Sequence, residues 1–311
     1  MIVDPFSDIL KLTNAQTVVS GGFTAGGLWA MRFPPPDKMK FFALVKGSCW
    51  LSIDGNEAPV RIEAGDMFLV SAQRSFVLAA DLTLEPLDAV TVFAGKKSRI
   101  AQVGDGDDCV QIGCHVRLDP ASRRLLADVL PPLIHVRASS PQAAVLQWLL
   151  DQLVLEQAEE LPGANVASAQ LAQLMFVQLL RAYLADSESL PLGWLKALSD
   201  PEIAPVLRLM HGDPGKAWGL EELARAAAMS RTTFAVRFKS VAGVPPLTYL
   251  LNWRMRLAEH ALREEDTTIS DLGMSLGYTS ESAFSNAFKR VMGSAPKRYR
   301  DAVRKTVSAR N

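Results

Sequence analysis

The fold of this chain is decided by residues 269–300, which read ISDLGMSLGYTSESAFSNAFKRVMGSAPKRYR. The pattern predicts a helix, a tight turn at Gly277 and a second helix that ends near a basic run. In a helix-turn-helix unit the second helix turns an apolar side to the core and a polar side to the DNA major groove. Here Phe284, Phe288 and Val291 recur at helical spacing on the apolar side. The residues expected to face DNA are Glu281, Ser282, Ser285, Asn286 and Lys289.

A similar unit lies about fifty residues upstream, in residues 219–250, GLEELARAAAMSRTTFAVRFKSVAGVPPLTYL. Phe234, Phe238 and Val241 repeat the apolar spacing, and Ser230 precedes the helix as an N-cap in the way that Ser280 does. The first recognition helix is therefore predicted over residues 231–241. The residues expected to face DNA in this unit are Arg231, Thr232, Ala235, Val236 and Lys239.

The segment between the two units, NWRMRLAEHALRE, is predicted to be a helix that holds them at a fixed distance. Its apolar positions are Met255, Ala258 and Leu262. Successive major-groove faces on one side of B-DNA lie roughly 34 Å apart, so a rigid spacer would let one chain contact both.

Residues from about 201 to 300 resemble the DNA-binding domain of the AraC/XylS family of bacterial transcription regulators. The resemblance is carried by GYTSESAFSNAFKRVMGSAPKRYR and LEELARAAAMSRTTFAVRFKSVAG. It implies double-stranded promoter DNA as a partner. It further implies a small-molecule effector, RNA polymerase and a second copy of the chain as candidate partners.

Specific base contacts can be assigned to the two recognition helices. Members of the family often have an arginine where this chain has Val236, so Ala235 and Val236 are expected to contact thymine methyl groups. Arg231 and Lys239 are then left for phosphates. In the second helix, Asn286 is expected to pair with adenine. Glu281 either accepts from a cytosine or stabilises the helix N-terminus.

The charge is distributed unevenly although the chain as a whole has a formal net charge of zero. Residues 200–311 hold 17 lysines and arginines against 12 acidic residues, which makes this part the one expected to face DNA. The start of the chain shows no secretory leader, and no apolar run of membrane-spanning length follows, so a cytoplasmic protein without membrane contacts is expected. The cations expected near phosphates are Arg231, Arg237, Lys239, Lys289, Arg290, Lys297, Arg298 and Arg300.

Residues 1–118 are strand-like and contain turn signals at 54–55 and 65–66. Short strands between glycine-containing turns fit a small antiparallel barrel or sandwich. The passage KGSCWL…DG…RIEAGDMFLV resembles the cupin-like sensing domain of one AraC subfamily, a likeness carried by Gly47, Gly65 and Asp66. The fold class expected is thus multidomain α+β, with a cupin-like antiparallel β-barrel, a helical junction and an all-α pair of helix-turn-helix units.

Cupins are often metal enzymes, but this chain lacks the histidines that such sites use. Its four histidines, at 115, 135, 211 and 260, lie outside the first two barrel motifs, and Phe42 and Phe76 stand where related sequences tend to place histidine. We therefore expect no metal, no cofactor and no enzymatic activity. An apolar effector pocket is expected instead, although these aromatics could equally fill the core. The candidate lining residues are Trp29, Phe42, Trp50 and Phe76.

The three cysteines are Cys49, Cys109 and Cys114, an odd number that argues against a disulfide framework. Cys109 and Cys114 form a candidate redox switch, which would require an exposed thiol of lowered pKa. The alternative is that both are small core residues.

Residues 119–199 are predicted to form a helical junction, with apolar stripes over 145–154 and 171–183. The two helices are expected either to pack on the barrel or to form a dimer interface. Asp200 before Pro201 is expected to be the N-cap of the first helix of the DNA-binding domain, residues 200–311.

These features together predict a one-component transcription regulator, in which a small-molecule effector in the N-terminal barrel controls promoter binding by two helix-turn-helix units. Three alternatives were retained. One is a redox-sensing regulator that uses Cys109 and Cys114. The others are a cupin-type enzyme with a regulatory helical domain and an architectural DNA-binding protein that senses nothing.

Overall fold

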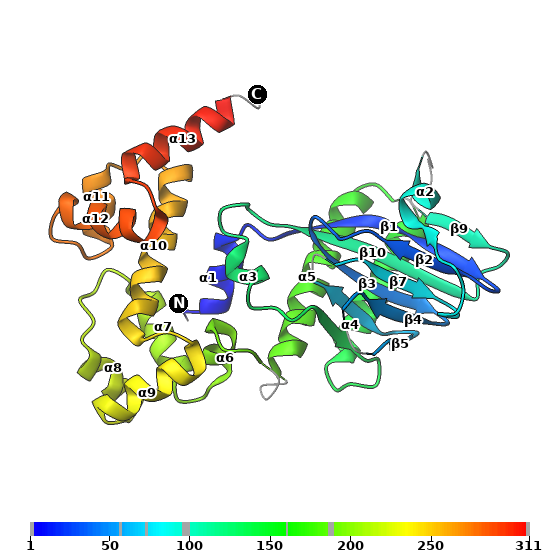
Figure 1. The fold of residues 1–311 in the computed structure, drawn as a ribbon, viewed down its shortest axis with the longest axis horizontal. Helices are drawn as coiled ribbons and strands as arrows, with labels where there is room; N and C mark the ends of the chain where they lie inside the picture. Colours follow the sequence, from blue (N-terminus) through cyan, green and yellow to red (C-terminus); the bar gives the residue numbers. More distant parts are fainter. Residues whose placement is uncertain are drawn as a thin grey trace. The chain divides into compact units, whose positions relative to one another are not determined.

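The computed structural model describes residues 3–55, 58–71, 74–94, 100–159, 161–185 and 190–308 (Figure 1). The chain folds into two compact units, which we call the β unit, residues 14–186, and the DNA-binding unit, residues 1–13 with 187–311. This division differs from the predicted one. The predicted junction is divided, with residues 119–186 in the β unit and residues 187–199 in the DNA-binding unit, and the first thirteen residues belong to the DNA-binding unit.

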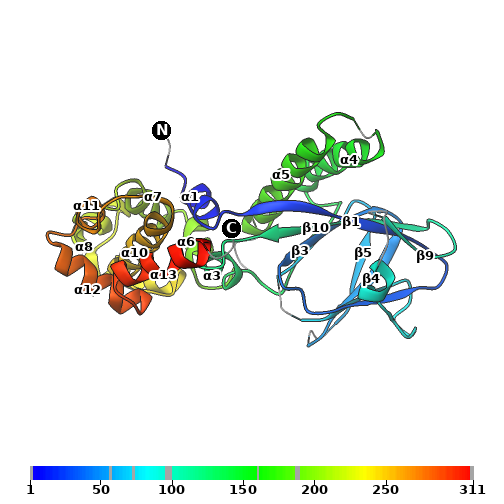
Figure 2. The ribbon, with the colours of Figure 1, turned by 90° about the horizontal axis from the view of Figure 1, so that it is seen from above.

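The β unit consists of two sheets that enclose a common core (Figure 2). The cupin-like, mainly antiparallel class is confirmed, but the strands form two separate sheets in place of one closed barrel. The six-stranded sheet has the order β11-β6-β3-β10-β1-β9, and the five-stranded sheet has the order β5-β4-β7-β2-β8. The strands are β1 Gln16–Gly26, β2 Ala30–Phe33, β3 Met39–Lys46, β4 Ser48–Ile53, β5 Val60–Glu63, β6 Met67–Val70, β7 Phe76–Ala79, β8 Leu87–Asp88, β9 Ile100–Gly104, β10 Cys109–Arg117 and β11 Leu133–Val136.

Aromatic side chains from both sheets meet in the core. Phe33 of β2 stacks on Phe76 of β7 with 4.7 Å between ring centroids, and Phe42 of β3 lies 5.0 Å from Phe68 of β6. Asp66, predicted from the sequence as a cupin-like position, is buried and accepts hydrogen bonds from backbone N–H groups of Glu63 and Ala138. It therefore fixes a turn and holds the chain after β11 against the sheet. Two short helices, α2 Ala89–Phe93 and α3 Arg124–Ala127, complete the connections.

The outer face of the six-stranded sheet is covered by a helical hairpin, α4 Ala143–Glu159 and α5 Ala164–Ala185. Phe41 of β3 packs on Phe176 of α5, and α4 packs on α5. The structure thus shows the first of the two predicted alternatives, in which the hairpin packs on the sheet. The other alternative, a dimer interface, stays a prediction. Among the helices that the structure describes, none is long and apolar enough to cross a membrane.

The DNA-binding unit begins with the N-terminal helix α1, Pro5–Leu12, whose Asp4 cap accepts from the N–H of Phe6 at 3.1 Å. Helix α1 packs on α7 and α10, and its Phe6 ring lies 6.3 Å from that of Trp194. Asp8 Oδ2 lies 3.4 Å from Nδ1 of His211, which stacks on Trp253 at 4.0 Å. Burial lowers the pKa of His211 to about 3, so this contact holds a neutral imidazole.

The remaining helices of this unit form the two predicted helix-turn-helix units. They are α6 Trp194–Ser199, α7 Ala204–Gly212, α8 Leu220–Ala226, α9 Arg231–Ala242, α10 Pro246–Glu264, α11 Ile269–Ser275, α12 Glu281–Met292 and α13 Pro296–Ser308. The long helix α10 contributes Leu250 to the first core, and Met255, Ala258 and Leu262 to the second. The predicted helix between the two units is confirmed, and it contributes to both hydrophobic cores. Its predicted apolar positions all pack in the core of the second unit, whereas Leu250, which precedes the predicted segment, packs in the core of the first.

Two local predictions in this unit need correction. Helix α7 begins at Ala204, because Asp200 caps a preceding turn through the N–H groups of Glu202 and Ile203, both at 3.0 Å. Val291 is 37% exposed, so it is not a core residue; the small side chain of Ala287 takes that place beside Phe284 and Phe288.

Candidate nucleic-acid interface and small-molecule pocket

The two recognition helices, α9 and α12, begin and end in the same way. Ser230 and Ser280 each accept a hydrogen bond from the backbone N–H three residues later, both at 3.2 Å. Gly243 and Gly293 end the helices in the left-handed region, with φ of 78° and 80°. The predicted serine N-caps are confirmed in both helices, and α9 ends at Ala242, one residue beyond its predicted end.

The residues predicted to face DNA lie on the exposed sides of these helices. Eight of the ten are exposed, and the two small ones, Ala235 and Ser285, are half-buried. Val236 is 66% exposed, which is unusual for a β-branched apolar residue. The helices are equivalent at a spacing of fifty residues, which pairs Lys239 with Lys289 and Val236 with Asn286. The lysine that both helices share is suited to the same phosphate contact in each unit. The position that holds valine in one helix and asparagine in the other is suited to different base contacts.

Two of the predicted phosphate-binding cations are already engaged within the protein. Arg237 donates to the buried carboxylate of Asp200 at 2.7 Å and lies 3.6 Å from Glu202. Arg300 donates to the carbonyl of Thr267 at 2.6 Å. These arginines hold helices together, so the prediction that they contact phosphates is not supported by their geometry.

The two helix-turn-helix units are locked together at the turn before α12. Gly277 has φ of 83°, and a Cβ atom built there would lie 2.0 Å from the carbonyl oxygen of Gly215. Arg254 of α10 donates to the carbonyl groups of Pro214 and Lys216 at 2.5 and 2.8 Å. The loop after α7 is therefore hydrogen-bonded to the spacer helix and lies in close backbone contact with the second turn. In the first unit the corresponding left-handed residue is Ala228, with φ of 53°.

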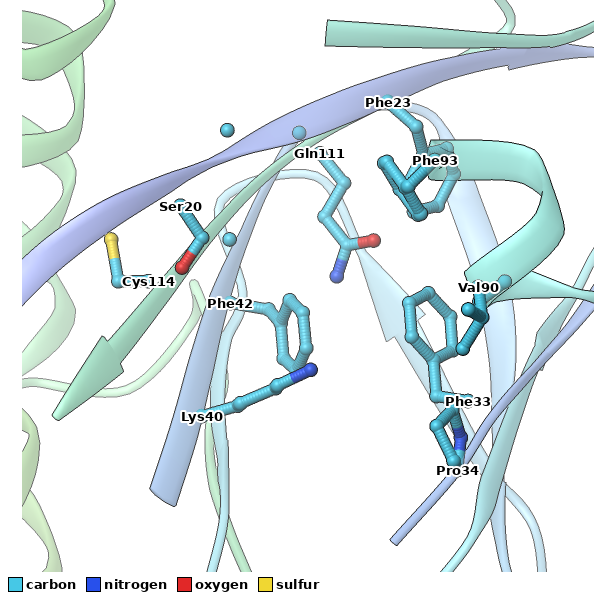
Figure 3. Close-up of a pocket in the computed structure, with 14 residues that line it drawn as sticks. Ser20, Phe23, Phe33, Pro34, Lys40, Phe42, Val90, Phe93, Gln111 and Cys114 are labelled. Atoms are coloured by element: carbon cyan, nitrogen blue, oxygen red, sulfur yellow. The ribbon is translucent and has the colours of Figure 1, made fainter. Parts of the chain in front are cut away.

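The β unit contains a cavity of about 310 Å³, near the lower end of the size range of small-molecule sites (Figure 3). It lies among β1, β2, β3, β10 and α2, and its lining is mostly apolar. The lining residues are Ser20, Gly21, Gly22, Phe23, Phe33, Pro34, Lys40, Phe42, Ala89, Val90, Phe93, Gln111, Gly113 and Cys114.

Of the four predicted pocket residues, only Phe42 lines this cavity. Trp29 is buried in the core against Phe23, at 5.2 Å between rings. Phe76 lies in the core too, stacked on Phe33. Trp50 is on the outer face of β4, where the Arg61 guanidinium lies over its ring at 5.2 Å. These three residues therefore lie outside this cavity, and Trp29 and Phe76 fill the core, which is the alternative that the sequence analysis left open.

Glycines on two neighbouring strands are among the residues that line the cavity. The β1 ladder is interrupted between Val19 and Gly21, and a Cβ on Gly22 would lie 2.1 Å from the carbonyl oxygen of Gln111. Gly113 of β10 pairs with Gly21, and a Cβ on Gly113 would meet the Phe42 ring at 3.3 Å. The signal that could have located the pocket was the glycine run in VVSGGF and the lone glutamine in CVQIGCHV.

Comparison with known proteins agrees with both halves of this description. Residues 4–185 match a family described as Cupin, and residues 223–302 match one described as Helix-turn-helix domain. An AraC-like transcription regulator of Streptomyces lividans is 40% identical over 96% of this chain and 98% of its own length. The chain belongs to the AraC-like transcription regulators.

More distant relatives span almost the whole regulator. The transcriptional regulator AlkR of Acinetobacter baylyi is 28% identical over 88% of this chain and 91% of its own length. Among solved structures, the DNA-binding domain of AdpA in complex with a target DNA is 34% identical. It covers 34% of this chain and 96% of that one, with a TM-score of 0.33.

Replacing Val236 by serine in this AraC-like regulator should relax its preference for thymine at one operator position by about 1 kcal/mol or less. The lost methyl groups are exposed in the protein alone, and valine and serine have similar helix propensity, so folding should not change. Binding selection from a random duplex library measures the preference. An unchanged preference at every position would remove Val236 from base recognition.

The three cysteines of the regulator are buried. Cys109 and Cys114 lie on opposite faces of β10, one in the core between the sheets and one toward the helical hairpin. Burial raises the pKa of Cys114 to about 12, whereas a hydrogen bond from Cys49 lowers the pKa of Cys109. The exposed, reactive thiol that the redox hypothesis requires is not present at either position.

The described residues contain no group of three or more His, Cys, Asp or Glu arranged to hold a metal ion. Ser20 Oγ and His115 Nδ1 lie 2.7 Å apart at the strand bulge. His115 is thus hydrogen-bonded to Ser20, which lines the cavity.

Proposed function

We propose that this regulator binds promoter DNA through α9 and α12 and that a small molecule in the β-unit cavity controls the binding. The observation that carries the proposal is the cavity itself, which is mostly apolar and built from glycines of β1 and β10. The same chain holds two helix-turn-helix units on one rigid spacer. A binding function requires no reaction, and the β unit is assigned none.

The path by which the effector acts is proposed to run through β1 and α1. Strand β1 lines the cavity with residues 20–23, and it begins only a few residues after α1, which packs inside the DNA-binding unit. Phe6→Ala should weaken the packing of α1 against Trp194. We expect the variant to bind the effector with unchanged affinity, but bound effector should change its affinity for the operator less than in the unaltered protein. If the effector changes operator affinity in this variant as much as in the unaltered protein, α1 is not the path.

The DNA-binding part of the proposal is tested by operator selection with the full-length protein, followed by footprinting. The expected footprint covers two major grooves on one side of the duplex, about one helical turn apart. Sedimentation of the free and operator-bound protein then shows whether a second copy joins. Binding without sequence preference would favour the architectural alternative.

The effector and thiol mechanisms are separated by a double variant, Cys109→Ala and Cys114→Ala. Alanine is chosen because both sites are buried, where a serine hydroxyl would lack a partner. We expect the transcriptional response to the signal to persist, with circular dichroism confirming the fold. Because Cys114 also lines the cavity, redox sensing would be supported only by loss, in a folded double variant, of a response to oxidant that a thiol reductant reverses in the unaltered protein.

A further inference from the structure

Gln111 is a buried polar side chain whose hydrogen-bonding groups are unused. It is 2% exposed on β10, and its amide points into the cavity (Figure 3). Neither Nε2 nor Oε1 has a hydrogen-bond partner among the described residues. Buried amides are nearly always paired, because an unpaired group keeps the full cost of leaving water. A partner that enters the cavity would remove this cost.

Lys40 brings a positive charge to the same cavity from β3. Its side chain is half-buried and extends toward Phe42 in Figure 3. Burial lowers the pKa of the Lys40 ammonium, and Lys38 lowers it further, against the opposing effect of Asp37. Among the described residues that line the cavity, none carries a carboxylate. On its cavity side the Lys40 ammonium therefore meets no counter-charge from these residues.

The rest of the lining determines the body of the molecule that fits. Phe23, Phe33 and Phe42 form the inner wall, and Val90 and Phe93 of α2, exposed by 59% and 37%, stand at the rim. These side chains offer apolar contact to a compact hydrophobic group. The polar side chains of the lining, Ser20, Lys40 and Gln111, come from β1, β3 and β10 and lie on the opposite side of the cavity from α2.

We infer that the cavity binds an apolar molecule that bears one carboxylate, which accepts hydrogen bonds from the Lys40 ammonium and the Gln111 amide. This assignment rests on the effector control proposed above, for which it supplies the ligand class. Charge-assisted hydrogen bonds in an apolar surrounding are stronger than neutral ones, so the carboxylate distinguishes this ligand from a neutral analogue. The Gln111 oxygen is then left to accept from a hydroxyl group or water.

Two pairs of probes test the charge requirement by calorimetry on the full-length protein. The pairs are 2-naphthoate with 2-naphthamide, and decanoate with decanamide, each nearly matched in shape and differing in charge. In at least one pair the carboxylate should bind roughly 10- to 100-fold more tightly than the amide. Equal affinities in both pairs, or no binding by any probe, overturn the inference.

Variants at three lysine and glutamine positions identify the residues responsible. Lys40→Met should abolish most of the preference for the carboxylate. Lys38→Met is the matched control, because Lys38 lies two residues away, pairs with Asp37 and does not line the cavity. Gln111→Leu should raise the melting temperature of the unliganded protein and weaken carboxylate binding. A preference that persists in Lys40→Met, or is lost equally in Lys38→Met, contradicts the assignment.

The operator affinity, measured with and without each carboxylate, separates this inference from the proposed function. Carboxylate binding that changes operator affinity supports both. Carboxylate binding that leaves operator affinity unchanged supports the ligand assignment and contradicts effector control. Binding of the neutral amides alone, with a change in operator affinity, overturns the ligand assignment and supports effector control.

Discussion

Gly277→Ala is expected to destabilise the DNA-binding unit by about 3 kcal/mol or more. The backbone of Gly277 has φ of 83°, and the new Cβ would lie 2.0 Å from the carbonyl oxygen of Gly215. Alanine therefore adds the strain of a left-handed conformation to a clash with backbone, which cannot rotate away. Hydrogen exchange of the α11 and α12 amides in urea isolates the stability of this unit from that of the β unit.

Gly293→Ala is the matched control in the same unit. Gly293 has nearly the same φ, 80°, but nothing lies within 4 Å of a Cβ built there. Only the strain of the left-handed backbone conformation remains, and the free energy of unfolding should fall by about 1 kcal/mol. The difference between the two variants therefore measures the contact with Gly215. Equal losses would show that the close approach of the two backbones does not exist in solution.

Loss of this contact has a consequence for DNA binding. Gly215 and Gly277, with Arg254, join the loop of the first helix-turn-helix unit to the turn of the second. A displaced turn would alter the spacing of α9 and α12, which must match the helical repeat of DNA. Gly277→Ala should thus weaken operator binding even under conditions where the unit remains folded.

The sequence predicted the turn at Gly277 but not why glycine is needed there. A positive φ is suggested by local pattern alone, whereas the contact with Gly215 joins residues about sixty positions apart. The caps of α9 and α12 were predictable because Ser230, Ser280 and the glycines act within their own helices. The place of α1 in the DNA-binding unit was not, because its apolar face fits several surfaces equally well.

The pocket shows the same limit in the β unit. Alternation along β4 places Cys49 inside and Trp50 outside, but the sequence does not state which face of a strand is the inner one. The size of an aromatic side chain therefore does not show whether it lines a pocket, and Trp50 lies on the outer face. The cavity is lined in part by Gly21, Gly22 and Gly113, and it can be located only once β1 and β10 are paired in register.

Asn286→Ala is expected to lower the affinity for the operator by about 1–3 kcal/mol, and to do so at one base pair. Asn286 is exposed on α12 at the position equivalent to Val236 on α9, and an asparagine there can pair with the N6 and N7 edge of adenine. Alanine has the higher helix propensity, so a loss of binding cannot be explained by unfolding of α12. Operators carrying each of the four bases at each position identify the base pair concerned.

Lys289→Ala provides the contrast, because Lys289 is exposed one turn further along the same helix. If it contacts a phosphate, its removal should weaken all duplexes alike and reduce the slope of log affinity against log salt by about one. Lys239→Ala, at the equivalent position of α9, should behave in the same way. Weakening by Asn286→Ala that ignores sequence would move Asn286 to the phosphate backbone, and a base-specific loss in Lys289→Ala would exchange the two roles.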